Sequence, residues 1–229
     1  MEAYEKIGLC GTIGSGKSHV ARLLGSLGYK HINSDALYKT SIATNPAYQA
    51  CLDGYLRHKC PSAFMNGMLM EGNIVVKGVS PNFDGVYSVS ELSRYLFGPV
   101  SESLGYEPIE SLSNFNAPYI LSELKRHIEP RCVVEMATLP TFEYFDALNF
   151  DIVIHIVGGS VENAIARDKH RDENITRSVH AYQTLELSNV HELPNVRTLK
   201  TTDNEGNFLS DDEILQNLKS LLSKEIYHE

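Results

Sequence analysis

The chain lacks several features that would place it in a special class of protein. It has 229 residues, only four of them are cysteines, and no two cysteines form a C-x-x-C pair. This pattern argues against a disulfide-rich secreted scaffold and fits the reduced thiols of a cytoplasmic protein. No apolar run is long enough to span a bilayer, so we expect no membrane partner. The first ten residues also lack the basic start and apolar stretch of a secretory signal.

Positive charge is also scarce. Lysine and arginine number 20 against 29 aspartates and glutamates, which gives a formal net charge of -9. Nucleic-acid binding needs a basic surface, so we expect no nucleic-acid partner. An anionic small-molecule substrate would have to be held by a few local cations. The expected assembly is a monomer or a small homo-oligomer.

Short apolar runs alternate with helical patterns at the two ends of the chain. The runs of strand length lie at residues 6–10, 29–32, 131–137, 151–157 and 196–202. The segments with helical spacing lie at residues 17–27, at 160–174, from there to about 187, and from 210 onward. Ser210 and Glu213 form a capping box for the last helix. This alternation predicts an α/β fold, with a five-stranded parallel sheet between two layers of helices.

The middle of the chain interrupts this alternation. Residues 40–128 hold most of the prolines, a stretch rich in glycine and asparagine, and several weak helical patterns. We therefore predict a single domain over 1–229. Its core would comprise 1–39 and 129–229, and it would carry a helical substrate-binding insertion at about 40–128.

Residues 11–18 read GTIGSGKS and match the phosphate-loop pattern G-x-x-x-x-G-K-[ST]. The glycines let backbone N–H groups turn toward an anion, and the following helix directs its positive end at the same place. Lys17 is expected to reach the β- and γ-phosphates of ATP, and Ser18 to ligate Mg²⁺. The alternative is a glycine turn that matches by chance, but the motif lies between a predicted strand and a predicted helix, as phosphate binding requires. The expected nucleotide-binding residues here are Gly11, Thr12, Ile13, Gly14, Ser15, Gly16, Lys17, Ser18 and His19.

Further motifs favour a small kinase over a switch GTPase. The N-K-x-D motif of switch GTPases is absent, and DNEG at 203–206 fits D-x-x-G in letters only. A kinase needs an acceptor site near the loop, and Asp35 follows the second predicted strand, where open α/β sheets hold their ligands. Its carboxylate could orient or deprotonate an acceptor hydroxyl. Equally, Asp35 could be the N-cap of a helix that starts at Ala36.

Two arginines follow the fourth predicted strand. Arg167 and Arg171 are four residues apart and would project from one face of a helix. They could form a lid, at about 160–185, that covers ATP and neutralises charge on the transferring phosphoryl group. The alternative is a solvated charged face, because the segment RDKHRDE also offers acidic partners.

The order of these segments resembles that of the dephospho-coenzyme A kinase family. The matching segments lie roughly at 5–40 and 150–222, and they read IGLCGTIGSGKSHVARLLGSLGYKHINSDALYK, FDIVIHIVGGSVENAIARDKHRD, a glutamine at 183, and DNEGNFLSDDEIL. The resemblance implies a phosphate-loop kinase that phosphorylates the ribose 3′-hydroxyl of dephospho-coenzyme A with ATP and Mg²⁺. It also implies that Asp35 activates the acceptor, that Arg171 is the lid arginine, and that Asn204 and Gly206 border the adenine.

The chain departs from the family pattern mainly in its middle. Asn33 stands where the family has the first aspartate of I-D-A-D, and Ala117 precedes Pro118 where the family has H-P. A nucleoside or nucleotide kinase with another acceptor therefore stays open, as does a nucleotide-binding protein that has lost transfer activity. Glu135 lies near the end of the third predicted strand, close to where a second carboxylate directed at Mg²⁺ would lie, although chance or helix capping explains it equally well.

Overall fold

The computed structural model describes residues 4–59, 96–97, 107–167 and 172–223. The chain divides into two compact units. One comprises Met1–Ser34 and Leu112–Glu229, and the other comprises Asp35–Ser111. Among the described residues, none of the helices is both long and apolar enough to cross a membrane.

The first unit is built on one parallel sheet with the strand order β2-β3-β1-β4-β5. The strands are β1 (Lys6–Cys10), β2 (Lys30–Asn33), β3 (Cys132–Glu135), β4 (Ile152–Val157) and β5 (Val196–Lys200). All four neighbouring pairs are parallel, so the predicted five-stranded parallel sheet is confirmed. The central strands β1 and β3 are almost wholly buried, as expected for a parallel sheet covered on both faces. Because they are neighbours, their carboxyl ends lie side by side at the start of the glycine loop.

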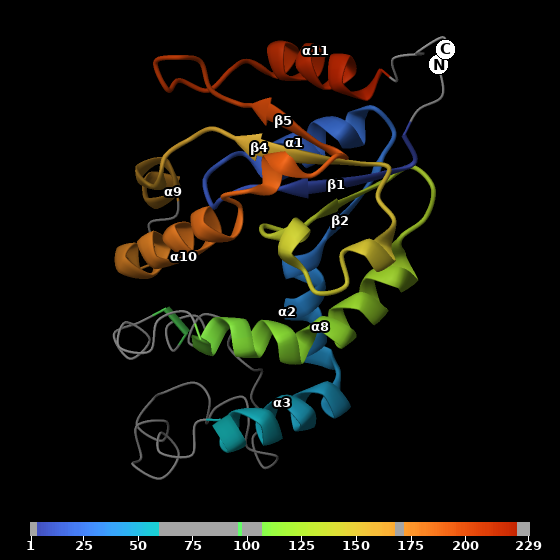
Figure 1. Ribbon diagram of the computed structural model, residues 1–229, viewed down its shortest axis with the longest axis vertical. Helices are drawn as coiled ribbons and strands as arrows, with labels where there is room; N and C mark the ends of the chain where they lie inside the picture. The colour runs from blue at the N-terminus through green and yellow to red at the C-terminus, as the bar shows by residue number, and fades with distance from the viewer. Residues whose placement is uncertain (1–3, 60–95, 98–106, 168–171, 224–229) are drawn as a thin grey trace. The chain divides into compact units, whose positions relative to one another are not determined.

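Helices of the first unit flank this sheet. In Figure 1 the strands lie between α11, drawn in red, and α10, drawn in orange. The α-helices wholly within the unit are α1 (Lys17–Ser26), α9 (Val161–Arg167), α10 (Glu173–Glu186) and α11 (Asp211–Leu222). Short 3-10 turns follow β3 and precede β5, namely η1 (Leu139–Thr141), η2 (Asp146–Leu148) and η3 (Val190–Glu192).

Apolar side chains from α1 and α11 cover one face of the sheet. Leu24 of α1 and Leu218 of α11 are fully buried in one cluster with Leu9 and Ile154 of the strands. Burying a leucine or isoleucine side chain contributes roughly 1.5–3 kcal/mol, so this cluster fixes α1 firmly under the loop that precedes it. On the other face, a Cβ at Gly8 would lie 2.6 Å from the Leu139 side chain, so the glycine allows η1 to pack closely.

The second unit is described only in part. Its helices include α2 (Ser34–Thr44) and α3 (Pro46–Lys59). The rings of Tyr38 and Tyr48 meet edge to face, with their centroids 6.3 Å apart. The long helix α8 (Glu107–His127) runs across the boundary between the units.

Two helix ends show how the sequence patterns translate into structure. Gly28 has a φ of 89° and directly follows Leu27, the C-cap of α1, so it is the left-handed glycine that ends this helix. The predicted helix over 160–174 is wrong as a single element. Asp172 has extended backbone and its carboxylate accepts hydrogen bonds from the N–H groups of Asn174 and Ile175, so it caps a new helix, α10.

Candidate nucleotide-binding site

The loop between β1 and α1 can form only with glycine at several positions. Gly11, Gly14 and Gly16 have φ values of 146°, 86° and 96°, in the left-handed region that other residues rarely adopt. A Cβ on Gly11 would lie 2.5 Å from the carbonyl oxygen of Ile156, and one on Gly14 would lie 2.9 Å from Ala164. The glycines therefore keep the loop backbone tight against its neighbours, as a cradle for an anion requires.

The first turn of α1 completes this cradle. Gly16 is the N-cap of α1 and offers no side chain to the N–H groups of the first turn. Such N–H groups, with the positive end of the helix dipole, make a ready site for phosphate. The Lys17 ammonium donates to the carbonyl oxygens of Gly11 at 2.8 Å and Thr12 at 2.9 Å. A cation is therefore held directly at the mouth of the loop.

Glu135 links this loop to the neighbouring strands. Its carboxylate accepts a hydrogen bond from the Ser18 hydroxyl at 2.6 Å through Oε1. Its Oε2 accepts from His31 Nε2 at 2.8 Å and from Asn33 Nδ2 at 3.0 Å. Asn33 is the register partner of Glu135 in the parallel pair of β2 and β3, which explains why these side chains meet. From the sequence, Glu135 could be a carboxylate directed at Mg²⁺, a helix cap or a chance occurrence. The structure places it beside the Ser18 hydroxyl.

The surroundings of Glu135 favour its ionised form. Burial is the largest single effect and raises its pKa. Hydrogen bonds from His31 and Ser18, with the electrostatic attraction of His31 and Lys17, together outweigh burial and hold the pKa below its ordinary value. Glu135 is therefore a buried carboxylate that carries its negative charge at neutral pH.

A pocket of about 320 Å³ opens beside the amino-terminal end of α1. The guanidinium of Arg167 lies over the ring of Phe208, 4.5 Å from its centroid, at one side of this pocket. The size and the mixture of apolar and polar groups suit a flat heterocycle. The lining residues include Gly16, His19, Arg167, Thr201, Phe208 and Asp211.

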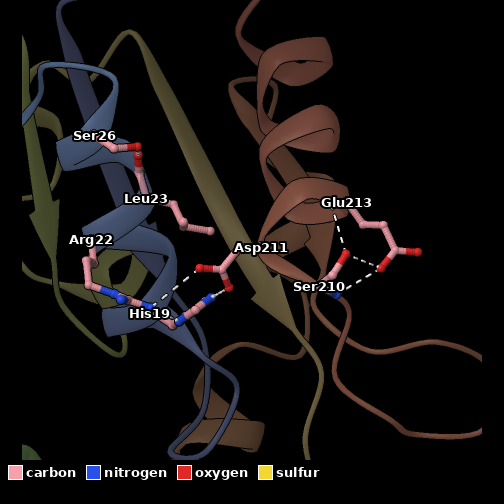
Figure 2. Close-up of polar contacts among 7 residues, drawn as sticks. All are labelled: His19, Arg22, Leu23, Ser26, Ser210, Asp211 and Glu213. Carbon is pink, nitrogen blue, oxygen red and sulfur yellow. Dashed lines mark hydrogen bonds and ion pairs between the residues drawn. The ribbon is translucent and has the colours of Figure 1, made fainter.

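His19 and Asp211 connect the pocket walls. Figure 2 shows His19 and Arg22 of α1 directed toward Asp211 at the start of α11, beside the Ser210–Glu213 capping box. His19 Nε2 lies 2.9 Å from Asp211 Oδ1, and Arg22 lies 2.8 Å from His19 Nδ1. Because arginine can only donate, Nδ1 accepts and the Nε2–H donates to Asp211. The pocket is thus bordered by two helix starts, those of α1 and α11.

The predicted lid segment contacts the loop through one glutamine. Gln183 of α10 accepts a hydrogen bond from the N–H of Ile13 at 2.6 Å. Arg177 of the same helix pairs with Glu162 of α9 at 2.9 Å. The described parts of residues 160–185 are thereby joined to each other and to the glycine loop.

The remaining predicted site residues fall in three places. Asp35 lies in the first turn of α2, which begins at Ser34, so the alternative that Asp35 is an N-cap is wrong. Arg171 lies outside the described residues. Asn204 and Gly206 lie in the exposed turn closed by the bridge between Thr202 and Phe208.

Sequence reasoning missed several residues of the site. Phe208 and Asp211 line the pocket, whereas the sequence of this segment pointed to Asn204 and Gly206. Thr201 also lines the pocket, and its hydroxyl donates to the Ser15 carbonyl oxygen at 2.8 Å. Phe208 could have been found as an aromatic residue that lies between the turn at 203–206 and the capping box at Ser210. His31 carried no signal, because its contact with Glu135 depends on strand order.

Comparison with solved structures places the chain among proteins of this fold. It matches TT1252 from Thermus thermophilus with a TM-score of 0.52 and 20% identity, over 96% of this chain and 97% of that chain. It matches a dephospho-CoA kinase from Campylobacter jejuni with a TM-score of 0.49 and 15% identity, over 96% and 98% of the two chains. A shikimate kinase from Acinetobacter baumannii matches with a TM-score of 0.48 and 15% identity, over 97% and 96%. No protein-family model matches the chain, and no curated protein matches it significantly.

These identities make the similarity one of fold. The chain shares with TT1252 an α/β fold, which here has a five-stranded parallel sheet and flanking helices. What the fold is used for must be argued from the site itself.

Proposed function

We propose that the chain is a cytoplasmic, ATP-dependent kinase that phosphorylates the ribose 3′-hydroxyl of dephospho-coenzyme A, the last step of coenzyme A biosynthesis. The observation that carries the proposal is the glycine-built loop with Lys17 at its mouth and the ionised Glu135 behind Ser18. A loop that served only to turn the chain would not need a buried carboxylate at this position.

The site fits ATP in two parts. The loop and the first turn of α1 suit the phosphates, because backbone N–H groups and the Lys17 ammonium converge there. The pocket that begins at Gly16 suits the base, with Phe208 and Arg167 offering flat surfaces for stacking. Phosphates and base would therefore lie on either side of the start of α1.

The donors beside the loop also fit Mg²⁺. The Ser18 hydroxyl and the Glu135 carboxylate are the hard oxygen groups that this ion prefers, and they already lie 2.6 Å apart. Ser18 would hold the ion, with Glu135 next to it. When bound, Mg²⁺ supplies positive charge to the phosphate oxygens.

The residues of the chain would divide the work of transfer among them. Lys17 would exchange its carbonyl partners for the β- and γ-phosphates, and Arg171 would neutralise charge on the transferring group. Glu135 is a poor proton acceptor, because both of its oxygens already accept hydrogen bonds and its pKa is low. The resemblance to dephospho-coenzyme A kinases instead gives proton acceptance from the acceptor hydroxyl to Asp35.

The identity of the acceptor rests on the order of motifs along the chain. The phosphate loop, the Asp35 segment, the arginine pair and Gln183 occur in the order found in dephospho-coenzyme A kinases. Of these residues, Gln183 contacts the loop directly, since its side chain accepts from the Ile13 N–H. Asn33 replaces the first aspartate of the family's I-D-A-D segment, so two alternatives are tested as well. One is a nucleoside or nucleotide kinase with another acceptor, and the other is a nucleotide-binding protein without transfer activity.

A coupled assay of ADP release with a panel of acceptors tests the proposal. Dephospho-coenzyme A should stimulate ADP release in the presence of ATP and Mg²⁺, while nucleosides and nucleotides should not. Stimulation by a nucleotide alone would favour the first alternative. ATP binding without release of ADP for any acceptor would favour the second.

A further inference from the structure

One side chain near the loop has no role in the function proposed above. His31 lies on β2, two residues before Asn33, so both side chains project from the same face of the sheet. Both donate to the same atom, Oε2 of Glu135, at 2.8 and 3.0 Å. The other oxygen, Oε1, accepts from Ser18.

The three hydrogen bonds fix the direction of the Ser18 hydroxyl. Because its proton is donated to Glu135, the lone pairs of Ser18 Oγ point elsewhere and are left for a ligand. Glu135 can hold that proton in place only if its own carboxylate does not rotate. Two donors on Oε2 oppose such rotation, and of the two His31 makes the shorter bond.

We propose that His31 is a positioning residue of the magnesium–nucleotide site, and that it acts through Glu135 on Ser18. This inference rests on the proposed function, since it presumes that the loop binds ATP with Mg²⁺. Groups that orient metal ligands from behind typically change metal affinity by about 10- to 100-fold when they are removed.

The exposures of the two side chains favour this role over a packing role. The Glu135 side chain is 7% exposed, whereas that of His31 is 32% exposed. His31 therefore fills little of the core, and its main contribution is the N–H that it directs at a buried carboxylate. A side chain that offers an N–H at a similar position should replace it.

The test compares three variants by calorimetric titration with the β,γ-imido analogue of ATP, once with excess Mg²⁺ and once with EDTA. His31→Ala removes the donor, and His31→Gln offers an amide N–H in its place. His127→Ala is the matched control, because His127 is a half-buried histidine of α8 that hydrogen-bonds the backbone carbonyl of Glu123, away from the loop. The quantity compared is the magnesium enhancement, the ratio of the two dissociation constants.

We expect His31→Ala to lower the magnesium enhancement by about tenfold, at the lower end of the range for such groups, while the affinity measured with EDTA stays within about threefold. His31→Gln and His127→Ala should keep most of the enhancement. His31→Leu, which keeps bulk without a donor, replaces the alanine variant if circular dichroism shows that the latter is unfolded.

Other outcomes overturn the inference and separate it from the proposed function. Full enhancement in the folded His31→Ala or His31→Leu protein would remove His31 from the site while leaving the kinase proposal intact. Equal losses in His31→Ala and His31→Gln would show that a donated N–H is not what matters. A wild-type protein that binds no nucleotide under either condition would instead contradict the proposed function, and the inference with it.

Discussion

The Ser18 hydroxyl donates a hydrogen bond to Oε1 of Glu135 across 2.6 Å, which joins the first turn of α1 to the carboxyl end of β3. These residues are far apart in the sequence, and they meet because β1 and β3 are neighbours in the sheet. The contact couples the phosphate loop to a buried, ionised carboxylate.

Glu135 should make the stability of the fold depend on acid pH. Its folded-state pKa lies below the ordinary value of 4.5, so its contribution is present above that value and is lost as the pH falls through the folded-state pKa. The free energy of unfolding in urea should fall less steeply from about pH 5 to about pH 3 in Glu135→Gln than in the wild type. The exposed Glu143→Gln serves as control. Equal slopes for wild type and Glu135→Gln would contradict the assigned pKa.

Phe208 should contribute to nucleotide affinity through stacking. Stacking of a base on an aromatic ring is worth about 1–3 kcal/mol, so Phe208→Ala should weaken ATP binding by about tenfold or more. Leu185→Ala is a suitable control, because Leu185 is also an exposed apolar residue but does not line the pocket. Titration calorimetry measures both. Equal affinity of Phe208→Ala and wild type would place the base elsewhere.

Arg171 should act on the transition state more than on the bound nucleotide. Arg171→Lys keeps the charge but loses the planar fork that contacts several phosphate oxygens, so turnover should fall by roughly 10³-fold with little change in ATP affinity. Steady-state kinetics and calorimetry separate the two effects, with Arg126→Lys on α8 as control. Comparable losses in affinity and turnover would make Arg171 a simple binding residue.

Asp35 should be needed for transfer but not for ATP binding. Asp35→Asn keeps the shape of the side chain and removes the base, so turnover should fall by roughly 10²- to 10⁴-fold. If Asp35 only stabilises the first turn of α2, the change should cost about 0.3–1 kcal/mol of stability and leave turnover intact. Asp212→Asn is the matched control, because Asp212 is a first-turn acid of α11. Unaltered turnover in Asp35→Asn would leave the site without its base.

Much of the fold could be predicted because its signals are local. The loop glycines and Lys17 act within a few residues of one another, and the capping box at Ser210 is a contact between positions three apart. The strands are short apolar runs whose burial pattern follows from covering both faces of the sheet. Asp172 was missed as a cap because acidic residues are common on exposed helix faces as well as at N-caps.

The site was harder to predict because it depends on strand order. The link between His31 and Glu135 spans about a hundred positions and forms only because β2 pairs with β3. The pocket is likewise lined by Gly16, Arg167 and Phe208, which follow three different strands, β1, β4 and β5. No periodicity in the sequence reports such contacts.

The central claim is that this chain transfers the γ-phosphoryl group of ATP to dephospho-coenzyme A. The most direct measurement incubates the protein with γ-³²P-labelled ATP, Mg²⁺ and dephospho-coenzyme A, then separates the products. We predict that the label appears in coenzyme A, on the ribose 3′-oxygen, and that Lys17→Ala, folded by circular dichroism, yields none. ATP binding by the wild type without label in coenzyme A would contradict the claim.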